Sequence, residues 1–406
     1  MTTLRRSPEN VVVPRGFLFG AAIAGIKASG RPDLALAYAP SGATAAALFT
    51  RNRVVAAPVE AGRRSLKASK GRMRMVLVNS GNANCATGVS GRHACEHVCR
   101  EAAKLMAVSP SEVFPSSTGI IGVPFPADKV VRALPELIRR KSETADSALA
   151  FARAIITTDT RIKIASAQFH IGASKQVNVL GIAKGSGMIH PNLATMLVYV
   201  FTDIAASPAE LQVQLRAACE DSFNVMSVDG DTSTNDTVLL MASGQSDVRM
   251  RHAFVKKKFS AALVHVGQSL AEQIVSDGEG VQHVIRLTVE QARTRREALV
   301  VARAIAHSAL VKTAWAGTDP NWGRILAAAG ACGIPMDPGR VQIHIGDQRV
   351  CHNGAAHPFD QNRAHQALAQ PECDVRVQLG RGKNSVRFLT TDLTAEYVRI
   401  NADYST

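Results

Sequence analysis

The feature that most constrains the fold is a short apolar run at residues 195–203, TMLVYVFTD, bounded by polar and glycine-rich sequence. The run is rich in β-branched and aromatic side chains, which favour strands. Its apolar residues are continuous rather than alternating with polar ones, which predicts a strand buried on both faces. Such a strand needs packed structure on either side of it.

Other segments predict that the packed layers contain both helices and strands. Residues 72–88, RMRMVLVNSGNANCATG, resemble a strand followed by a polar, glycine-containing loop, and a helix around Cys95 comes next. At residues 207–210 a serine, a proline and a glutamate have the spacing of a capping box, which predicts the start of a helix. Residues 283–292 are expected to form a strand and residues 294–311 a helix. The predicted fold class is therefore α/β, with α and β layers, and the 406 residues are enough for two or three packed lobes.

The formal net charge of +14 raises the question of a nucleic-acid partner. The basic residues are spread along the chain, however, and the clearest cluster, residues 248–259, is better interpreted as a solvated face. Aromatic residues make up only 5% of the chain, which leaves little stacking surface for single strands. No nucleic-acid partner is expected, and the excess of positive charge would instead attract small anionic substrates.

The cysteines and the apolar segments indicate in which compartment the protein works and whether it binds a metal. The seven cysteines are an odd number with scattered spacing, which is typical of reduced thiols. No apolar run is long enough to span a membrane, and the first ten residues lack the apolar core of a secretory signal. The chain is therefore expected to be cytoplasmic and not bound to a membrane. Cysteines and histidines at residues 93–99 suggest a metal site, but Cys95, Cys99 and Met106 fall on one helical stripe, which favours core packing.

Thr195 is the first candidate for chemistry, because it stands between a turned, glycine-rich approach at residues 184–191 and a rigid strand. A threonine at a strand entrance is usually there because its β-branch suits strands. If the Ala194–Thr195 bond were cut, however, the freed α-amine of Thr195 would act as the base for its own hydroxyl. The cut would be intramolecular: the hydroxyl attacks the Ala194 carbonyl, the acyl group shifts from nitrogen to oxygen, and water hydrolyses the ester.

Both cleavage and acyl transfer pass through a tetrahedral oxyanion, which needs hydrogen-bond donors. The best candidate segment is SSTGIIG at residues 116–122. In it, the Thr118 hydroxyl and the Gly119 backbone N–H would supply two donors, since glycine permits close backbone approach. Taken alone, the segment favours a simple tight turn.

Taken together, the motifs resemble the ornithine acetyltransferase family, the bifunctional glutamate N-acetyltransferases of arginine biosynthesis. The resemblance covers nearly the whole chain and is carried by AAGIKASGRPDLAL, LFTRNRVVAAPV, VNSGNAN, PSSTGIIG, TTDT, AKGSGMIHPNLATML, SFNVMSVDGDTSTNDT, SDGEG, TDPNWGRI and INADYST. It implies an αββα sandwich of the N-terminal-nucleophile-like type, autoprocessed into an α chain of residues 1–194 and a β chain of residues 195–406. The expected assembly is a heterotetramer of two α and two β chains.

The resemblance also implies the reaction and the residues that perform it. Acetyl would move from N-acetylornithine to glutamate through an acetyl ester, and some family members also use acetyl-CoA as donor; no cofactor and no metal are implied. Thr195 would be the nucleophile, with Thr118 and Gly119 as the oxyanion hole. Lys184 would pair with a substrate carboxylate and Glu279 with the ornithine ammonium group. The implied substrate contacts are Thr158, Lys184, Thr195, Glu279, Asn401 and Thr406.

Several of these residues and motifs have simpler explanations. Lys184 and Glu279 would also suit surface charges in glycine turns, and the last residues of a chain are often frayed. The segment VDGDTSTND resembles a calcium loop but lacks the closing glutamate, so a structural acidic turn near the site is favoured. KGSG lacks the full spacing of a phosphate-binding loop and precedes a strand. The sequence departs from the family pattern at Leu193 in NLATM and at Cys85 and Ala86 in NANCATG, and neither departure changes a residue assigned to chemistry.

Two other functions remain open at this stage. An N-terminal-nucleophile aminopeptidase or amidase would use the same scaffold with water as the acyl acceptor. A basic nucleic-acid-binding protein is the alternative from another class, and salt-dependent retention on DNA would reveal it. Lys184, Glu279 and the NADYST tail favour the acetyltransferase, because they suit amino-acid donors and acceptors.

Overall fold

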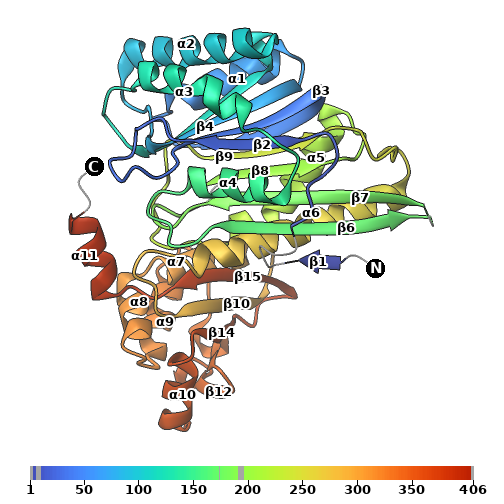
Figure 1. Cartoon of the computed structure of the whole chain (residues 1–406). Coiled ribbons are helices and arrows are strands. Elements are labelled where there is room, and N and C mark those ends of the chain that lie inside the picture. Colours follow the sequence, from blue (N-terminus) through green and yellow to red (C-terminus); the bar gives the residue numbers. More distant parts are fainter. Residues whose placement is uncertain (1–2, 6–10, 173, 191–195, 404–406) are drawn as a thin grey trace.

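The computed structural model describes residues 3–5, 11–172, 174–190 and 196–403. Its main body is a nine-stranded sheet that bends back on itself, with helices on both outer faces (Figure 1). A smaller unit with a six-stranded sheet lies below it in that view.

The long strand β3 (Leu34–Phe49) produces the bend. Its first part pairs with β2 and β4, its last part pairs with β9, and the register shifts between Tyr38 and Ala43. An irregularity of this kind lets one strand serve two differently oriented parts of a sheet. The strands are β1 (Thr3–Arg5), β2 (Leu18–Ala22), β4 (Arg72–Asn82), β5 (Val113–Ile120), β6 (Lys163–Ile171), β7 (Lys175–Lys184), β8 (Leu197–Thr202) and β9 (Thr237–Ala242).

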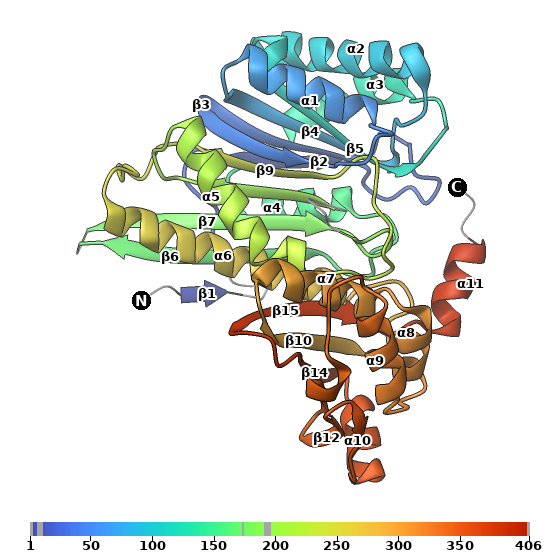
Figure 2. The same ribbon diagram turned by 180° about the vertical axis from the view of Figure 1, so that it is seen from behind.

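Side-chain alternation along β3 shows how the layers stack. Leu34 and Leu36 point into an outer core shared with helices α1, α2 and α3. Ala35 and Ala37 point the other way, into a central core shared with β7, β8, β9 and α4. Helices α5 and α6 cover the opposite outer face, as Figure 2 shows. The order helix, sheet, sheet, helix is the predicted αββα sandwich. The helices are α1 (Ala57–Ala68), α2 (Gly88–Met106), α3 (Ala127–Arg139), α4 (Ala145–Ile155), α5 (Pro208–Glu220) and α6 (Ala253–Val275), with the short turns η2 (Pro110–Glu112) and η3 (Phe223–Val225).

The smaller unit follows α6 and has its own core, in which Trp315 and Phe388 are fully buried. Its sheet is ordered β13-β12-β11-β14-β10-β15, and α11 stands at its edge, on the side facing the sandwich (Figure 1). The elements are β10 (Val284–Ala292), α7 (Arg295–Ala306), α8 (Ala309–Ala316), α9 (Trp322–Gly330), η4 (Pro338–Arg340), β11 (Gln342–Ile345), β12 (Gln348–His352), β13 (Ala355–Ala356), α10 (Gln361–Leu368), β14 (Glu372–Gln378), β15 (Asn384–Thr391) and α11 (Ala395–Asp403).

Most local predictions are confirmed and one is wrong. Every residue of β8 is buried, as expected for a strand covered on both faces. Ser207 and Glu210 form the predicted capping box at the start of α5. The helix expected over residues 294–311 is instead two helices, because α7 ends at Ala306 and the Ser308 side chain caps the start of α8.

The cysteine stripe on α2 also has the predicted role. Cys95 and Cys99 are buried in the outer core, and Met106 packs against it. Among the described residues, no three His, Cys, Asp or Glu side chains gather as a set of metal ligands. In the same part of the chain, no helix is both long and apolar enough to cross a membrane.

Candidate active site

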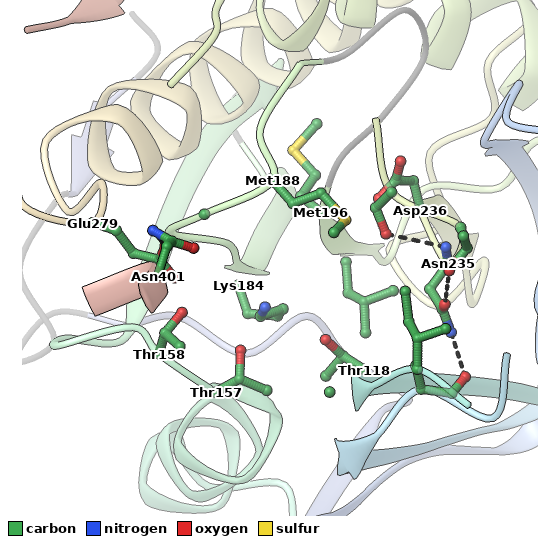
Figure 3. Close-up of a pocket in the computed structure, with 17 residues that line it drawn as sticks. Thr118, Thr157, Thr158, Lys184, Met188, Met196, Asn235, Asp236, Glu279 and Asn401 are labelled. Carbon is green, nitrogen blue, oxygen red and sulfur yellow. Dashed lines mark hydrogen bonds between the residues drawn. The ribbon is translucent and has the colours of Figure 1, made fainter. Parts of the chain in front are cut away.

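One pocket brings together the predicted site residues that the structure describes (Figure 3). It holds about 810 Å³ of empty space, open solvent included, which suits a small-molecule ligand. Ala194, Thr195 and Thr406 lie outside the described residues. The predicted residues that line the pocket are Thr118, Gly119, Thr158, Lys184, Glu279 and Asn401.

The pocket also contains both flanks of the segment with the predicted cleavage site. Met188 and Met196 line it from the two sides of residues 191–195. Strands β7 and β8 pair antiparallel, with Lys184 opposite Leu197, so the chain leaves the sheet and returns to it at the pocket. The sequence around the Ala194–Thr195 bond therefore begins and ends beside the residues predicted to act on it.

Gly119 has a conformation that only glycine tolerates at this point. Its φ is +131°, and a Cβ there would lie 2.3 Å from the Gly81 carbonyl carbon and 2.5 Å from the Asn82 nitrogen. Strand β5 can therefore lie close against β4 as it enters the pocket. The tight turn suggested for SSTGIIG is not what forms there: residues 116–120 belong to β5, and both Thr118 and Gly119 line the pocket.

Asn235 braces this strand from the opposite side of the sandwich. Its side-chain amide donates to the Ala83 carbonyl at 2.7 Å and to the Ser117 carbonyl at 2.9 Å. The Thr234 hydroxyl donates to the Asn235 side-chain oxygen at 2.7 Å, so the amide is held in one orientation. Ser117 immediately precedes Thr118, and the brace therefore fixes the position of the predicted oxyanion donors.

Lys184 is not the surface charge that a glycine turn would suggest, because only 8% of it is exposed. Its Nζ lies 3.8 Å from Asp159 Oδ2, at the edge of a buried cluster of charges. In that cluster Lys163 Nζ lies 2.6 Å from Asp159 Oδ1 and 2.5 Å from Asp277 Oδ2. Arg161 Nε lies 3.4 Å from Asp277 Oδ1, so three cationic groups surround the two aspartates, and the ammonium group of Lys184 is left on the pocket side.

Asp159 organises the backbone of the pocket as well as its charge. It accepts hydrogen bonds from the Thr157 N–H at 3.0 Å and the Gly185 N–H at 2.7 Å. Burial alone would raise the pKa of Asp159, but the charges of Lys184 and Lys163 hold that pKa well below its usual range. The carboxylate stays ionised and anchors the loops that carry Thr158 and Lys184.

The other end of the pocket is closed by the C-terminal helix. Asn401 on α11 donates its side-chain amide to Glu279 Oε2 at 3.0 Å. The helix comes close because residue 280 is glycine: it has φ +66°, and a Cβ there would lie 2.3 Å from the Tyr397 nitrogen. Asn401 is therefore part of an ordered helix rather than a frayed tail.

Sequence reasoning missed Asp236, which lines the pocket beside Asn235 and is buried. Burial raises the pKa of this carboxyl group well above its usual range. The signal was a polar run, residues 229–236, directly before an apolar strand, the same pattern that drew attention to Thr195. The favoured interpretation of this run as a structural turn holds for Asp229, which accepts from the Met188 and Ile189 N–H groups at 2.6 and 2.8 Å.

A pocket at the ends of β5 and β7, inside an αββα sandwich, places this protein in the N-terminal-nucleophile-like class. The chain belongs to the ArgJ family, whose sequence model matches residues 18–406. The resemblance drawn from the motifs is thereby confirmed.

Two relatives with high coverage agree with this family assignment. The chain is 46% identical to the arginine biosynthesis bifunctional protein ArgJ of Thermus thermophilus, with 98% of this chain and 100% of the relative covered. Identity to the protein of that name from Bradyrhizobium diazoefficiens is 43%, over 98% of this chain and 97% of the relative. A solved structure of ornithine acetyltransferase with ornithine, from Mycobacterium tuberculosis, is 36% identical over 48% of this chain and 100% of that chain, with a TM-score of 0.44.

Proposed function

We propose that the protein is a glutamate N-acetyltransferase of arginine biosynthesis, which moves acetyl from N2-acetyl-L-ornithine to L-glutamate through an acetyl ester on Thr195. The observation that carries this proposal is the single pocket that gathers Thr118, Gly119, Lys184 and Glu279 between the two flanks of residues 191–195. Family membership over residues 18–406 supports it.

Charge at the two ends of the pocket suits both substrates. N-Acetylornithine has a carboxylate and a side-chain ammonium group, and glutamate carries a second carboxylate in place of that ammonium group. Lys184, held ammonium-outward by the cluster around Asp159, would bind the carboxylate that both share. Glu279 would bind the ornithine ammonium group, with Asn401 and Thr158 beside it. Thr406 would complete the closure.

Maturation would come first. The Thr195 hydroxyl attacks the Ala194 carbonyl, the peptide C–N bond breaks, and its nitrogen becomes the α-amine of Thr195. Water then hydrolyses the ester and leaves two chains, residues 1–194 and 195–406. Thr118 and Gly119 would donate to the oxyanion in this step and again in turnover.

Turnover would follow in two half-reactions. The α-amine takes the Thr195 hydroxyl proton while the hydroxyl oxygen attacks the acetyl carbonyl; the amide C–N bond breaks, and ornithine leaves with that proton. The amine of glutamate then attacks the acetyl ester. Its C–O bond breaks, the hydroxyl regains a proton, and N-acetylglutamate leaves. One nucleophile serves the donor and the acceptor in turn, so the kinetics should be ping-pong.

Three further points belong to the proposal. Acetyl-CoA would be a second acetyl donor if the chain is bifunctional, as the names of its relatives say of them. The two chains would stay together through the β7–β8 pairing and assemble as a heterotetramer of two α and two β chains. The site of action would be the cytoplasm.

The decisive experiment separates transfer from hydrolysis. Purified protein is incubated with N-acetylornithine with and without glutamate, and N-acetylglutamate and free acetate are both measured. We expect N-acetylglutamate to form in step with ornithine. Acetate release at the same rate with or without glutamate would instead identify an amidase or aminopeptidase on this scaffold.

A further inference from the structure

A second cavity, which shares no lining residue with the active-site pocket, is rich in arginine. It lies between the end of α5, the exposed face of α7 and the turn that follows β3, and it holds about 1000 Å³ of empty space, open solvent included. We call it the arginine cleft. Its lining residues are Arg51, Arg216, Glu220, Asn224, Arg295, Arg296, Leu299 and Arg303.

Arginines outnumber acidic residues in the lining of the arginine cleft. Five guanidinium groups face one lining carboxylate, Glu220. Arg295 pairs with Asp221 at 2.8 Å and donates to the Glu220 carbonyl at 2.9 Å. Within the part of the chain that the structure describes, Arg51, Arg216 and Arg296 form no ion pair.

Two features of the cleft act against its positive charge. Arg303 is partly buried, and burial, together with the charge of Arg51, lowers the pKa of its guanidinium group. Arg295 and Arg296 stand in the first turn of the twelve-residue helix α7, where the helix dipole disfavours cations. Burial and the helix dipole thus both disfavour the positive charges that the fold brings together here.

We infer that the arginine cleft binds a small molecule that carries two or more phosphate groups. Guanidinium groups bind phosphate oxygens through paired hydrogen bonds, and several of them around one cavity need a ligand with several negative charges. Along α7, Arg296, Leu299 and Arg303 are spaced to face one side, so Arg296 and Arg303 would contact different parts of the ligand, on either side of Leu299. A bound polyanion would also meet the positive end of the α7 dipole.

A residue beside the arginine cleft contacts residues that line the active-site pocket. Next to Arg51, the Thr50 N–H donates to the Asp236 carbonyl at 3.0 Å and the Thr50 hydroxyl donates to the Ser233 carbonyl at 2.7 Å. Asp236 and Ser233 both line the pocket. The ligand is therefore either a free phosphorylated metabolite, sensed beside the site, or the phosphate-bearing tail of an acyl donor that reacts in it.

Calorimetric titration of the purified protein with inorganic pyrophosphate tests the inference. Arg216→Glu and Arg296→Glu each reverse an exposed charge of the cleft and should each weaken pyrophosphate binding by about tenfold or more. Arg100→Glu, on the exposed side of α2, is the matched control and should leave the affinity unchanged. Binding should also weaken as salt is raised, because the cleft is open to solvent.

Competition identifies the source of the phosphates. If CoA displaces pyrophosphate and Arg296→Glu weakens both, the cleft holds the tail of an acyl carrier. If pyrophosphate binds and CoA does not compete, the ligand is a free phosphorylated metabolite. Absence of pyrophosphate binding, equal binding by all three variants, or tight binding of single-stranded DNA alone would overturn the inference. These measurements need no turnover, so they stand apart from the proposed acetyl transfer.

Discussion

The active-site pocket and the arginine cleft differ in how far their positive charges are paired with carboxylates. Beside the pocket, the buried carboxylates of Asp159 and Asp277 pair with Lys163, Lys184 and Arg161, and both lysines are almost entirely buried. In the cleft, five arginines face one glutamate at a solvent-exposed surface. The difference indicates that the charged groups beside the pocket hold its loops in place without a ligand, whereas those of the cleft are available to bind one. Variants of each region should therefore affect different properties.

The largest effect is expected from Thr195→Ala. It removes the proposed nucleophile, so the chain should remain uncut and transfer should fall on the order of 10⁴-fold or more. Intact mass and N-acetylglutamate formation measure the two losses, with Thr313→Ala on the exposed face of α8 as a control. Pyrophosphate binding in the cleft should be unchanged. A cut and active Thr195→Ala protein would refute the mechanism.

The next largest difference is expected in the free energy of unfolding of variants in the two regions. Lys163→Met leaves the buried Asp159 and Asp277 with only the longer contacts to Lys184 and Arg161, and loss of one partner in a buried ion pair typically costs about 3–5 kcal/mol. Arg216→Met is the matched substitution in the cleft, where it relieves like-charge repulsion and should leave the unfolding free energy unchanged or slightly higher. Denaturant unfolding measures both. Equal destabilisation by the two variants would abolish the distinction.

Thr118→Ala should act on catalysis rather than on stability. It removes one proposed oxyanion donor, and such a loss typically lowers the rate by about 100- to 1,000-fold. To separate turnover from maturation, residues 1–194 with this substitution are co-expressed with residues 195–406 made as a separate chain. If that assembly turned over as fast as its wild-type counterpart, Thr118 would not be an oxyanion donor in transfer.

The smallest effect concerns His307, which lies beside the cleft. The pKa of His307 is lowered to about 3, mainly by burial and then by the neighbouring His190, Lys312 and Arg303. The unfolded chain, with a histidine pKa near 6.5, binds more protons between these values, so folding stability should fall as the pH drops below about 6.5. His307→Gln should reduce this slope, as measured by unfolding from pH 4 to 7. An identical slope in both proteins would show that His307 contributes nothing to it.

The two regions also differ in how much of each could be predicted from the sequence. The pocket could be predicted because its residues stand in short motifs beside strands, as Thr118 and Lys184 do. Asn235 and Asp236 belonged to a visible polar run, but which groups they would contact depends on how two halves of a bent sheet face each other. The arginine cleft gave no local signal at all. Arg51, Arg216 and Arg296 come from three distant segments, and each looks like an ordinary solvated charge until packing brings them together.

The pairing of β7 with β8 has a consequence for assembly. Residues 184 and 197 are opposite each other in the sheet, and both strands are buried in the centre of the sandwich. A chain cut between them would keep these hydrogen bonds, so its two pieces should unfold together in one cooperative transition. Refolding would differ, because two separate molecules would have to meet. The recovered yield should therefore depend on protein concentration, and a mature sample that has once been denatured should recover less readily than the uncut precursor.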